Sequence, residues 1–284
     1  MKMVDFLRFR LRTASVTAWC LAGAMALTVS SCSGDDDPEP FKPQLPAAGG
    51  SSLCSITHLG SVLSCYDWTF TYSNERLVSA SGTVRDPSSD IDGSFSYTSK
   101  LSYGTSSVGV ENSSGEETSV TLNSQGYIER MTVNRNIYQF TYVDGRISGW
   151  NKTVFETSFG QAMQYRSSAS IEYQNGNLSR IIYTETDNQP DTLTFTASSL
   201  VNYNGLLPET VSKELGCLSF EHLYYAGLLG RPTINLVKSL TYASGTSSSE
   251  NYTIDFEYST RDGNVVLCNY HTPDGEVASV SYGY

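Results

Sequence analysis

The fold is decided by the stretch Phe140-Thr141-Tyr142-Val143-Asp144-Gly145-Arg146-Ile147. Its first residues alternate between aromatic rings and other side chains, and this period of two places the rings on one face of a strand. Asp144-Gly145 predicts a two-residue hairpin turn, because Asp tolerates positive φ and Gly has no Cβ to oppose it. The stretch therefore predicts a β-hairpin that buries one face.

The same pattern recurs along the chain. Copies lie at residues 171–178 and 256–265, and a degenerate copy at residues 70–77 has Glu75 where the glycine would be. Further alternating runs or turn pairs lie at residues 68–72, 125–126, 193–197, 204–205 and 274–275. A meander of about a dozen or more strands has to curl, close or stack to cover its apolar face. We predict an all-β fold, an antiparallel meander of repeated hairpins curled into a barrel-like or wrapped sheet.

One segment departs from the period of two. Between residues 216 and 230 the apolar spacings are nearer three and four than two, and Gly230-Arg231-Pro232 ends the segment; the apolar residues are Leu218, Phe220, Leu223, Tyr224, Leu228 and Leu229. This spacing, followed by Gly and Pro, predicts one short helix near residues 217–229. Because Glu221 is its only charged residue before Arg231, we expect it to be buried as a plug across one end of the curled sheet.

The N-terminus carries an export sequence. Four cations precede an uncharged run at residues 13–31, which ends at Cys32, so residues 1–31 are interpreted as a signal peptide. Val29-Ser30-Ser31-Cys32 resembles a bacterial lipobox, which predicts lipidation of Cys32. An ordinary secretory signal and a short membrane anchor are the alternatives.

The residues after Cys32 indicate where the chain goes. Ser33-Gly34-Asp35-Asp36-Asp37 resembles the acidic export signal of surface lipoproteins, although a solvated acidic linker has the same composition. Residues 32–52 form an acidic and Pro-rich tether, and residues 53–284 form a single β-domain. We expect an outer-membrane location with a lipid anchor, facing the cell exterior. The expected partners are the membrane, through the lipid, and an extracellular glycan or protein.

Composition excludes two classes of protein. The chain of 284 residues is 39% hydrophobic and 12% aromatic, more than a disordered chain carries. It has 18 Lys and Arg against 29 Asp and Glu, for a net charge of −11. This charge disfavours nucleic acid as a partner, since such binding relies on Lys and Arg neutralising phosphates.

The chain resembles a known family. The similarity lies in the hairpin repeats, in the stretches at residues 224–232 and 235–240, and in the signal at Cys32. Together they resemble a family of gut-bacterial lipoproteins, a domain of unknown function with a porin-like fold. The hairpins alone also resemble the YD repeats of large secreted toxins. The family resemblance implies a barrel-like wrap and an envelope location, and it transfers no catalytic residues.

Four cysteines remain after Cys32, namely Cys54, Cys65, Cys217 and Cys268. An even number in an oxidising compartment allows up to two disulfides in one of three connectivities. Cys54 with Cys65 is the first expectation, since a hairpin between them would bring the side chains together. Free buried thiols are the alternative.

No catalytic or metal motif stands out. Asp90-Ile91-Asp92-Gly93 imitates a calcium loop but lacks the later bidentate Glu, and His58, His222 and His271 are isolated in sequence. We therefore expect no catalytic residue, no metal and no cofactor. A hydrolase with carboxylates brought together across strands is an alternative, because such carboxylates need only be close in space.

Aromatic residues outside the alternating register are the candidates for ligand contact. Trp150, Phe155 and Phe159 fall in this class, whereas the tyrosines in register with Ile, Phe and Leu are expected in the core. The terminal Tyr284 is typical of integral outer-membrane barrels, but the non-core faces are polar, so we expect a water-facing barrel filled by its own side chains. The predicted function is a non-catalytic binding module for a glycan or glycoprotein. An accessory subunit of an outer-membrane complex is the second class.

Overall fold

The computed structural model describes residues 52–60, 65–85, 95–158, 161–186 and 188–284. All of them belong to one unit of the chain, Pro38–Tyr284. The signal peptide, Cys32, the acidic stretch at residues 33–37, the tether up to residue 51, residues 90–93 and Phe159 lie outside the described residues.

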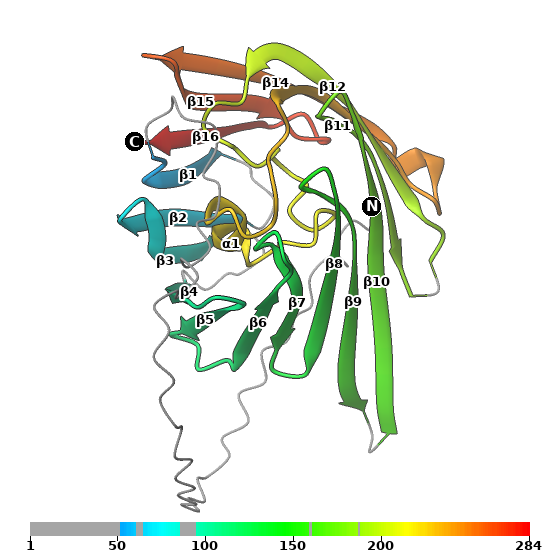
Figure 1. The fold of residues 1–284 in the computed structure, drawn as a ribbon. Coiled ribbons are helices and arrows are strands. Elements are labelled where there is room, and N and C mark those ends of the chain that lie inside the picture. Colours follow the sequence, from blue (N-terminus) through cyan, green and yellow to red (C-terminus); the bar gives the residue numbers. More distant parts are fainter. Residues whose placement is uncertain (1–51, 61–64, 86–94, 159–160, 187) are drawn as a thin grey trace, which may run out of the picture. The chain divides into compact units, whose positions relative to one another are not determined.

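The described residues form a closed antiparallel barrel of sixteen strands, in which each strand pairs with its neighbours in sequence and β1 pairs with β16. Figure 1 shows the strands wrapping around a central segment that contains α1, the one α-helix of the described residues; a single 3-10 turn, Ser248–Glu250, precedes β14. The strands are β1 Ser55–Gly60, β2 Cys65–Ser73, β3 Arg76–Arg85, β4 Phe95–Tyr103, β5 Ser107–Asn112, β6 Thr118–Leu122, β7 Ile128–Val133, β8 Asn136–Val143, β9 Arg146–Ser158, β10 Gln161–Gln174, β11 Asn177–Glu185, β12 Asp191–Val201, β13 Asn235–Ala243, β14 Tyr252–Arg261, β15 Asn264–His271 and β16 Val277–Gly283. The all-β meander predicted from the sequence is confirmed.

The predicted inner face is also confirmed. Phe140 and Phe256 are buried, and Tyr142 and Tyr258 pack against the same core. Gln139, between two inward rings on β8, is exposed. The alternation therefore separates an aromatic interior from a polar exterior, as a half-buried strand requires.

The two ends of the barrel differ. At one end, which we call the turn end, four two-residue turns have positive φ at both positions: residues 74–75, 144–145, 175–176 and 262–263. The opposite end, which we call the rim, carries the longest hairpin. There β8 pairs with β9 only as far as Thr153, and β11 pairs with β10 only as far as Ser167. Residues 154–158 and 161–165 therefore project past both neighbouring strands, and we call them the overhang.

A single segment fills the lumen. Residues 202–234, between β12 and β13, form what we call the plug, and most of them are buried. Sixteen strands enclose a lumen too wide for side chains alone, since porins of this size hold a water-filled channel. The interior is therefore filled by a length of backbone with its side chains as well as by the side chains of the wall.

The plug reaches wall residues on several strands. The His222 ring lies 5.0 Å from that of Trp68 on β2, and the Phe220 ring lies 5.7 Å from that of Tyr138 on β8. On β9, Trp150 donates a hydrogen bond from Nε1 to the carbonyl oxygen of Glu214 at 2.7 Å. The plug thus lies within the barrel rather than across one end of it.

The helix is shorter than predicted. α1 spans Glu221–Tyr225, inside the expected range of residues 217–229. Ser219 before it and Gly227 after it have positive φ, which a helix does not accommodate. The apolar residues of this segment are therefore explained by burial on all sides more than by the periodicity of a helix. No helix in the described part of the chain is long and apolar enough to cross a membrane.

The structure does not contain the expected Cys54–Cys65 disulfide. Cys54 is a free, exposed thiol, and its carbonyl accepts a hydrogen bond from the backbone N–H of Phe70. Cys65 begins β2 five residues earlier, about 16 Å away along the strand. A disulfide needs Cα atoms within about 7 Å, so the register separates the pair. Cys217 and Cys268 are free and buried, which is the alternative that the sequence left open.

The opposite faces of β8 provide a direct test of the inner and outer assignment. Replacing buried Phe140 with Ala is expected to lower the free energy of unfolding by about 3–5 kcal/mol, through lost burial and the cavity left behind. Gln139→Ala, one residue away on the exposed face, is the matched control and is expected to change it by less than about 0.5 kcal/mol. Denaturant unfolding of both variants measures the difference, and equal small losses would contradict the assignment.

Candidate functional site

The plug leaves the lumen along the turn end. Arg231 donates its backbone N–H to the carbonyl of Gly145 at 2.7 Å, and Ile234 donates to Gly176 at 3.1 Å. A Cβ on Gly230 would meet the Gly145 oxygen at 2.7 Å, so this close approach requires glycine. The Asp-Gly and Asn-Gly turns therefore do more than close hairpins, because they also hold the end of the plug.

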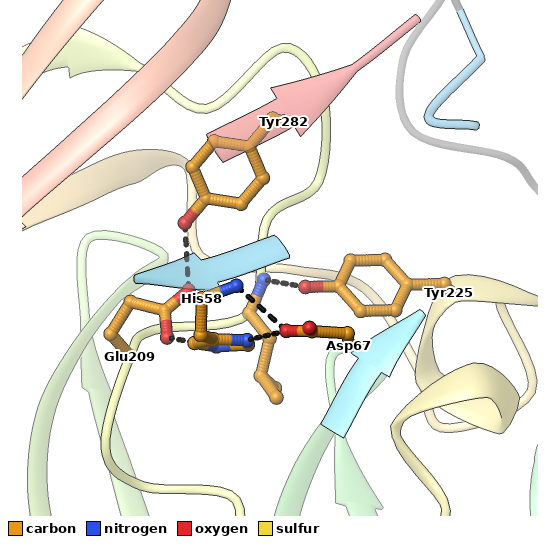
Figure 2. A network of polar contacts seen from close by, with 6 residues as sticks. His58, Asp67, Glu209, Tyr225 and Tyr282 are labelled. Carbon is orange, nitrogen blue, oxygen red and sulfur yellow. Dashed lines mark hydrogen bonds and ion pairs between the residues drawn. The ribbon is translucent and has the colours of Figure 1, made fainter. Parts of the chain in front are cut away.

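A polar network joins the plug to the strands that close the barrel (Figure 2). Glu209 of the plug accepts a hydrogen bond from the Tyr282 hydroxyl on β16 at 2.7 Å, and its other oxygen lies 3.5 Å from Nε2 of His58 on β1. On the far side of the imidazole, Asp67 of β2 lies 3.2 Å from Nδ1 and accepts the backbone N–H of His58 at 2.7 Å. Nearby in the same view, Tyr225 accepts the backbone N–H of Leu207 at 3.3 Å.

This network positions the plug and is poorly suited to catalysis. The side chains of His58 and Glu209 are only 10% and 12% exposed. Both imidazole nitrogens face carboxylates, so the ring presents no free lone pair to a substrate. A carboxylate on each side of the imidazole instead orients it across the β1–β16 junction, where the barrel closes.

The interior of the plug holds titratable groups with shifted pKa values. Burial raises the pKa of Glu214 to about 7 and that of Glu221 to about 7. Burial also lowers the pKa of His222 to about 3. Among the described residues, neither ring nitrogen of His222 and neither Oε2 atom of the two glutamates has a hydrogen-bond partner. At neutral pH, His222 is therefore an uncharged ring within an aromatic box.

A second polar cluster lies at the rim. The strand register aligns Tyr138, Lys152, Ser167 and Glu185 as successive partners across β8, β9, β10 and β11. Directly paired residues of an antiparallel sheet point to the same face, so this row lies on the inner side of the wall. Lys213 of the plug meets the row, with its Nζ 2.8 Å from Oε1 of Glu185. We call Tyr138, Lys152, Tyr183, Glu185 and Lys213 the rim cluster.

The rim cluster alternates cations with aromatic rings and a carboxylate. Nζ of Lys152 lies 5.2 Å from the ring centre of Tyr138, and Nζ of Lys213 lies 4.9 Å from that of Tyr183. The Tyr183 hydroxyl donates to Oε1 of Glu185 at 2.5 Å. The side chains of Lys213 and Glu185 are 30% and 40% exposed, so the cluster contacts solvent.

The pKa values of the rim cluster follow from these contacts. Burial lowers the pKa of Lys152, against the opposing attraction of Glu185. Partial burial acts to raise the pKa of Glu185, but the hydrogen bonds from Lys213 and Tyr183 outweigh it and lower the pKa overall. Glu185 is therefore ionised at neutral pH.

Two small hollows lie inside the described part of the barrel, and each has a free volume of about 10 Å³, enough for about one water molecule. One lies between Ile147, Tyr173 and Leu229, and the other between Leu207, Val237 and Tyr258. The described residues also contain no group of three or more His, Cys, Asp or Glu that could hold a metal ion.

The three expected ligand contacts have different positions. Trp150 is 3% exposed and lies beneath the plug, so its assignment as a ligand contact is wrong in this structure. The reason is a β-bulge in β9, where Thr141 pairs with Gly149 but Tyr142 pairs with Ile147, and the extra residue returns Trp150 to the inner face. Phe155 is 45% exposed and lies on the overhang, where it stays a prediction, and Phe159 lies outside the described residues.

Sequence reasoning missed the rim cluster. Lys152 shares the inward face with Trp150, and a lysine at an inward strand position was a signal that could have found it. Nothing local links Lys213 or Glu185 to this row, because the plug and the closure of the sheet bring them together.

A double-mutant cycle tests the network at the barrel closure. Glu209→Ala and Tyr282→Phe each remove one partner of a buried polar contact and are each expected to lower the free energy of unfolding by about 1–3 kcal/mol. The double variant is expected to lose less free energy of unfolding than the two single variants lose together, with a coupling energy of at least about 0.5 kcal/mol. Glu129→Gln, an exposed change on β7, is expected to add to Tyr282→Phe without coupling. Additivity of the first pair in denaturant unfolding would argue against the network.

The pH dependence of stability tests the buried acid. Because the pKa of Glu221 is raised to about 7 from 4.5, the folded chain holds this proton more tightly, and the resulting stabilisation is complete below about pH 4.5 and lost as pH rises through about 7. Glu221→Gln removes this loss. Between pH 5 and pH 8, the free energy of unfolding of the variant should therefore rise by up to about 3 kcal/mol relative to that of the natural protein. Exposed Glu257→Gln is the control, and a parallel pH profile for Glu221→Gln would contradict the assignment.

The chain is similar to known proteins with a porin-like fold. Residues 66–266 match the model of "Domain of unknown function (DUF4595) with porin-like fold". No curated protein matches. A porin-like protein from Bacteroides uniformis ATCC 8492 is similar in structure, with a TM-score of 0.61 and 19% identity over 81% of this chain and 97% of that one. A porin-like protein from Bacteroides vulgatus ATCC 8482 gives a TM-score of 0.46 and 10% identity over 83% of this chain and 99% of that one. The family match covers more than half of the sequence, and the chain therefore belongs to this family of domains with a porin-like fold.

Proposed function

We propose that the protein is a lipid-anchored lipoprotein of the outer membrane, facing the cell exterior, whose barrel binds a glycan or glycoprotein and does not conduct solutes. The observation that carries this proposal is the plug, which occupies the lumen and is bonded to the wall on several sides. A barrel of this strand number without a plug is a pore. With the plug in place, the remaining surfaces for function are the two ends and the outer wall.

Displacing the plug would be costly. Leu223 and Leu228 are completely buried, and Trp150 and Tyr282 of the wall each bond a group of the plug. Each fully buried leucine contributes about 1.5–3 kcal/mol. Many such side chains leave the lumen together if the plug leaves, so solute passage through this barrel is disfavoured.

The polar side chains of the outer wall favour attachment to the membrane by a lipid anchor over a barrel embedded in the membrane. Thr253, Asp255 and Glu257 of β14 are exposed on the face opposite the core, as are Gln139 and Thr141 of β8. Strands that face lipid carry apolar side chains on the outside. Attachment to a membrane would therefore come from outside the barrel, and an acylated Cys32 supplies it.

An accessory role in an outer-membrane complex is the second candidate. The overhang favours it, because Phe155 and Met163 are 45% and 41% exposed on a hairpin that projects past its neighbours. Exposed apolar side chains on projecting strands suit contact with another protein.

A binding screen and a labelling experiment test the main proposal. Cells producing the natural chain are expected to incorporate an alkyne-tagged fatty acid into it, whereas Cys32→Ala abolishes labelling and Cys20→Ala does not. External protease is expected to remove the domain from intact cells. The detergent-extracted protein is expected to bind members of a glycan and mucin array and to give no conductance in planar bilayers. A blank array, a protected domain or stepwise conductance would each contradict the corresponding part.

A further inference from the structure

We infer that the rim cluster and the neighbouring inward residues Val154, Met163 and Tyr165 of the overhang form the ligand site, and that the ligand is a neutral saccharide. This inference rests on the proposed binding function and assigns it a place and a chemical class. The site combines paired polar groups from the wall and plug with an exposed aromatic ring on the overhang.

The polar part offers a donor and an acceptor side by side. A sugar hydroxyl donates one hydrogen bond and accepts others, so it is bound best where a carboxylate and an ammonium are adjacent. Lys213 and Glu185 provide this pair at 2.8 Å. Oε1 of Glu185 already receives Lys213 and the Tyr183 hydroxyl, which leaves the exposed carboxylate with acceptor capacity at its second oxygen.

The apolar part lies next to it on the same face. Val154 is two residues beyond Lys152 on β9, and the register pairs it with Tyr165 on β10. Positions two apart on a strand share a face, so Tyr165 stands beyond the row of Lys152 and Ser167. Its ring is 39% exposed, and its hydroxyl contacts the sulfur of Met163 at 3.5 Å. The C–H face of a sugar ring packs on such an aromatic surface.

The balance of charges favours a neutral ligand. Lys152 and Lys213 face Glu185, and Asp191 pairs with Tyr183 in the register at the same end of the barrel. An acidic saccharide would meet Glu185 and Asp191, and a cationic ligand would meet the two lysines. The chain as a whole carries a net charge of −11, which adds to the penalty for an anion.

The test compares binding of neutral and acidic polysaccharides to the full mature chain. The probes are mannan, galactan and β-glucan as neutral saccharides and polygalacturonate as the acidic one, measured by isothermal titration. Tyr165→Ala and Glu185→Gln are each expected to weaken binding of the preferred neutral polymer about tenfold, since tenfold corresponds to about 1.4 kcal/mol. Gln164→Ala is the matched control, because Gln164 pairs with Phe155 on the opposite face of the same hairpin. It is expected to leave affinity unchanged within about twofold.

The outcomes separate the site from the function. If the natural chain binds a neutral polymer and both rim variants retain full affinity, the site is wrong while the binding function stands. A preference for polygalacturonate overturns the ligand class. Failure of the natural chain to bind any of the four polymers, with no neutral glycan bound on the array, overturns the saccharide assignment. Unchanged thermal unfolding of Tyr165→Ala, whose ring is exposed, excludes misfolding as the cause of lost binding.

Discussion

A closed barrel of sixteen strands encloses more space than its inward side chains can fill, and this constraint organises the whole domain. The meander supplies a polar wall with an aromatic lining, and the plug supplies the missing interior. Residues on β2, β8, β9 and β16 each contact the plug, so wall and plug share one core. The fold resembles that of a pore, but the plug fills the interior of the barrel.

The polar groups of the interior fall into two sets with different consequences. Glu209, His58 and Asp67 satisfy one another and tie the plug to the strands that close the sheet. In the described part of the chain, Oε2 of Glu221 and both ring nitrogens of His222 lack such partners, and burial shifts the pKa values of both residues toward the uncharged form. The first set specifies where the plug lies, whereas the second makes stability depend on pH.

Local patterns predicted the hairpins and the inner face, because the period of two and the Asp-Gly turns act over a few residues. Local patterns could not predict the features that depend on contacts between residues far apart in the sequence. Pairing of β1 with β16 and the depth of the plug are set by closure of the whole sheet. A single bulge beside Gly149 reversed the expected direction of Trp150, and no short pattern brings Lys213 to Glu185. The lipid anchor at Cys32 stays a prediction from the sequence.

Hydrogen exchange of the plug amides tests the central claim most directly. The N–H groups of Leu223 and Leu228 bond within a fully buried segment, at 2.8 Å to Phe220 and 3.0 Å to Leu223. If the plug is part of the core, these amides exchange as slowly as the amides of β8 that are paired with β7 and β9, because both open only when the barrel unfolds. Exchange in the plug as fast as in the exposed residues 248–251, while β8 stays protected, would contradict the account.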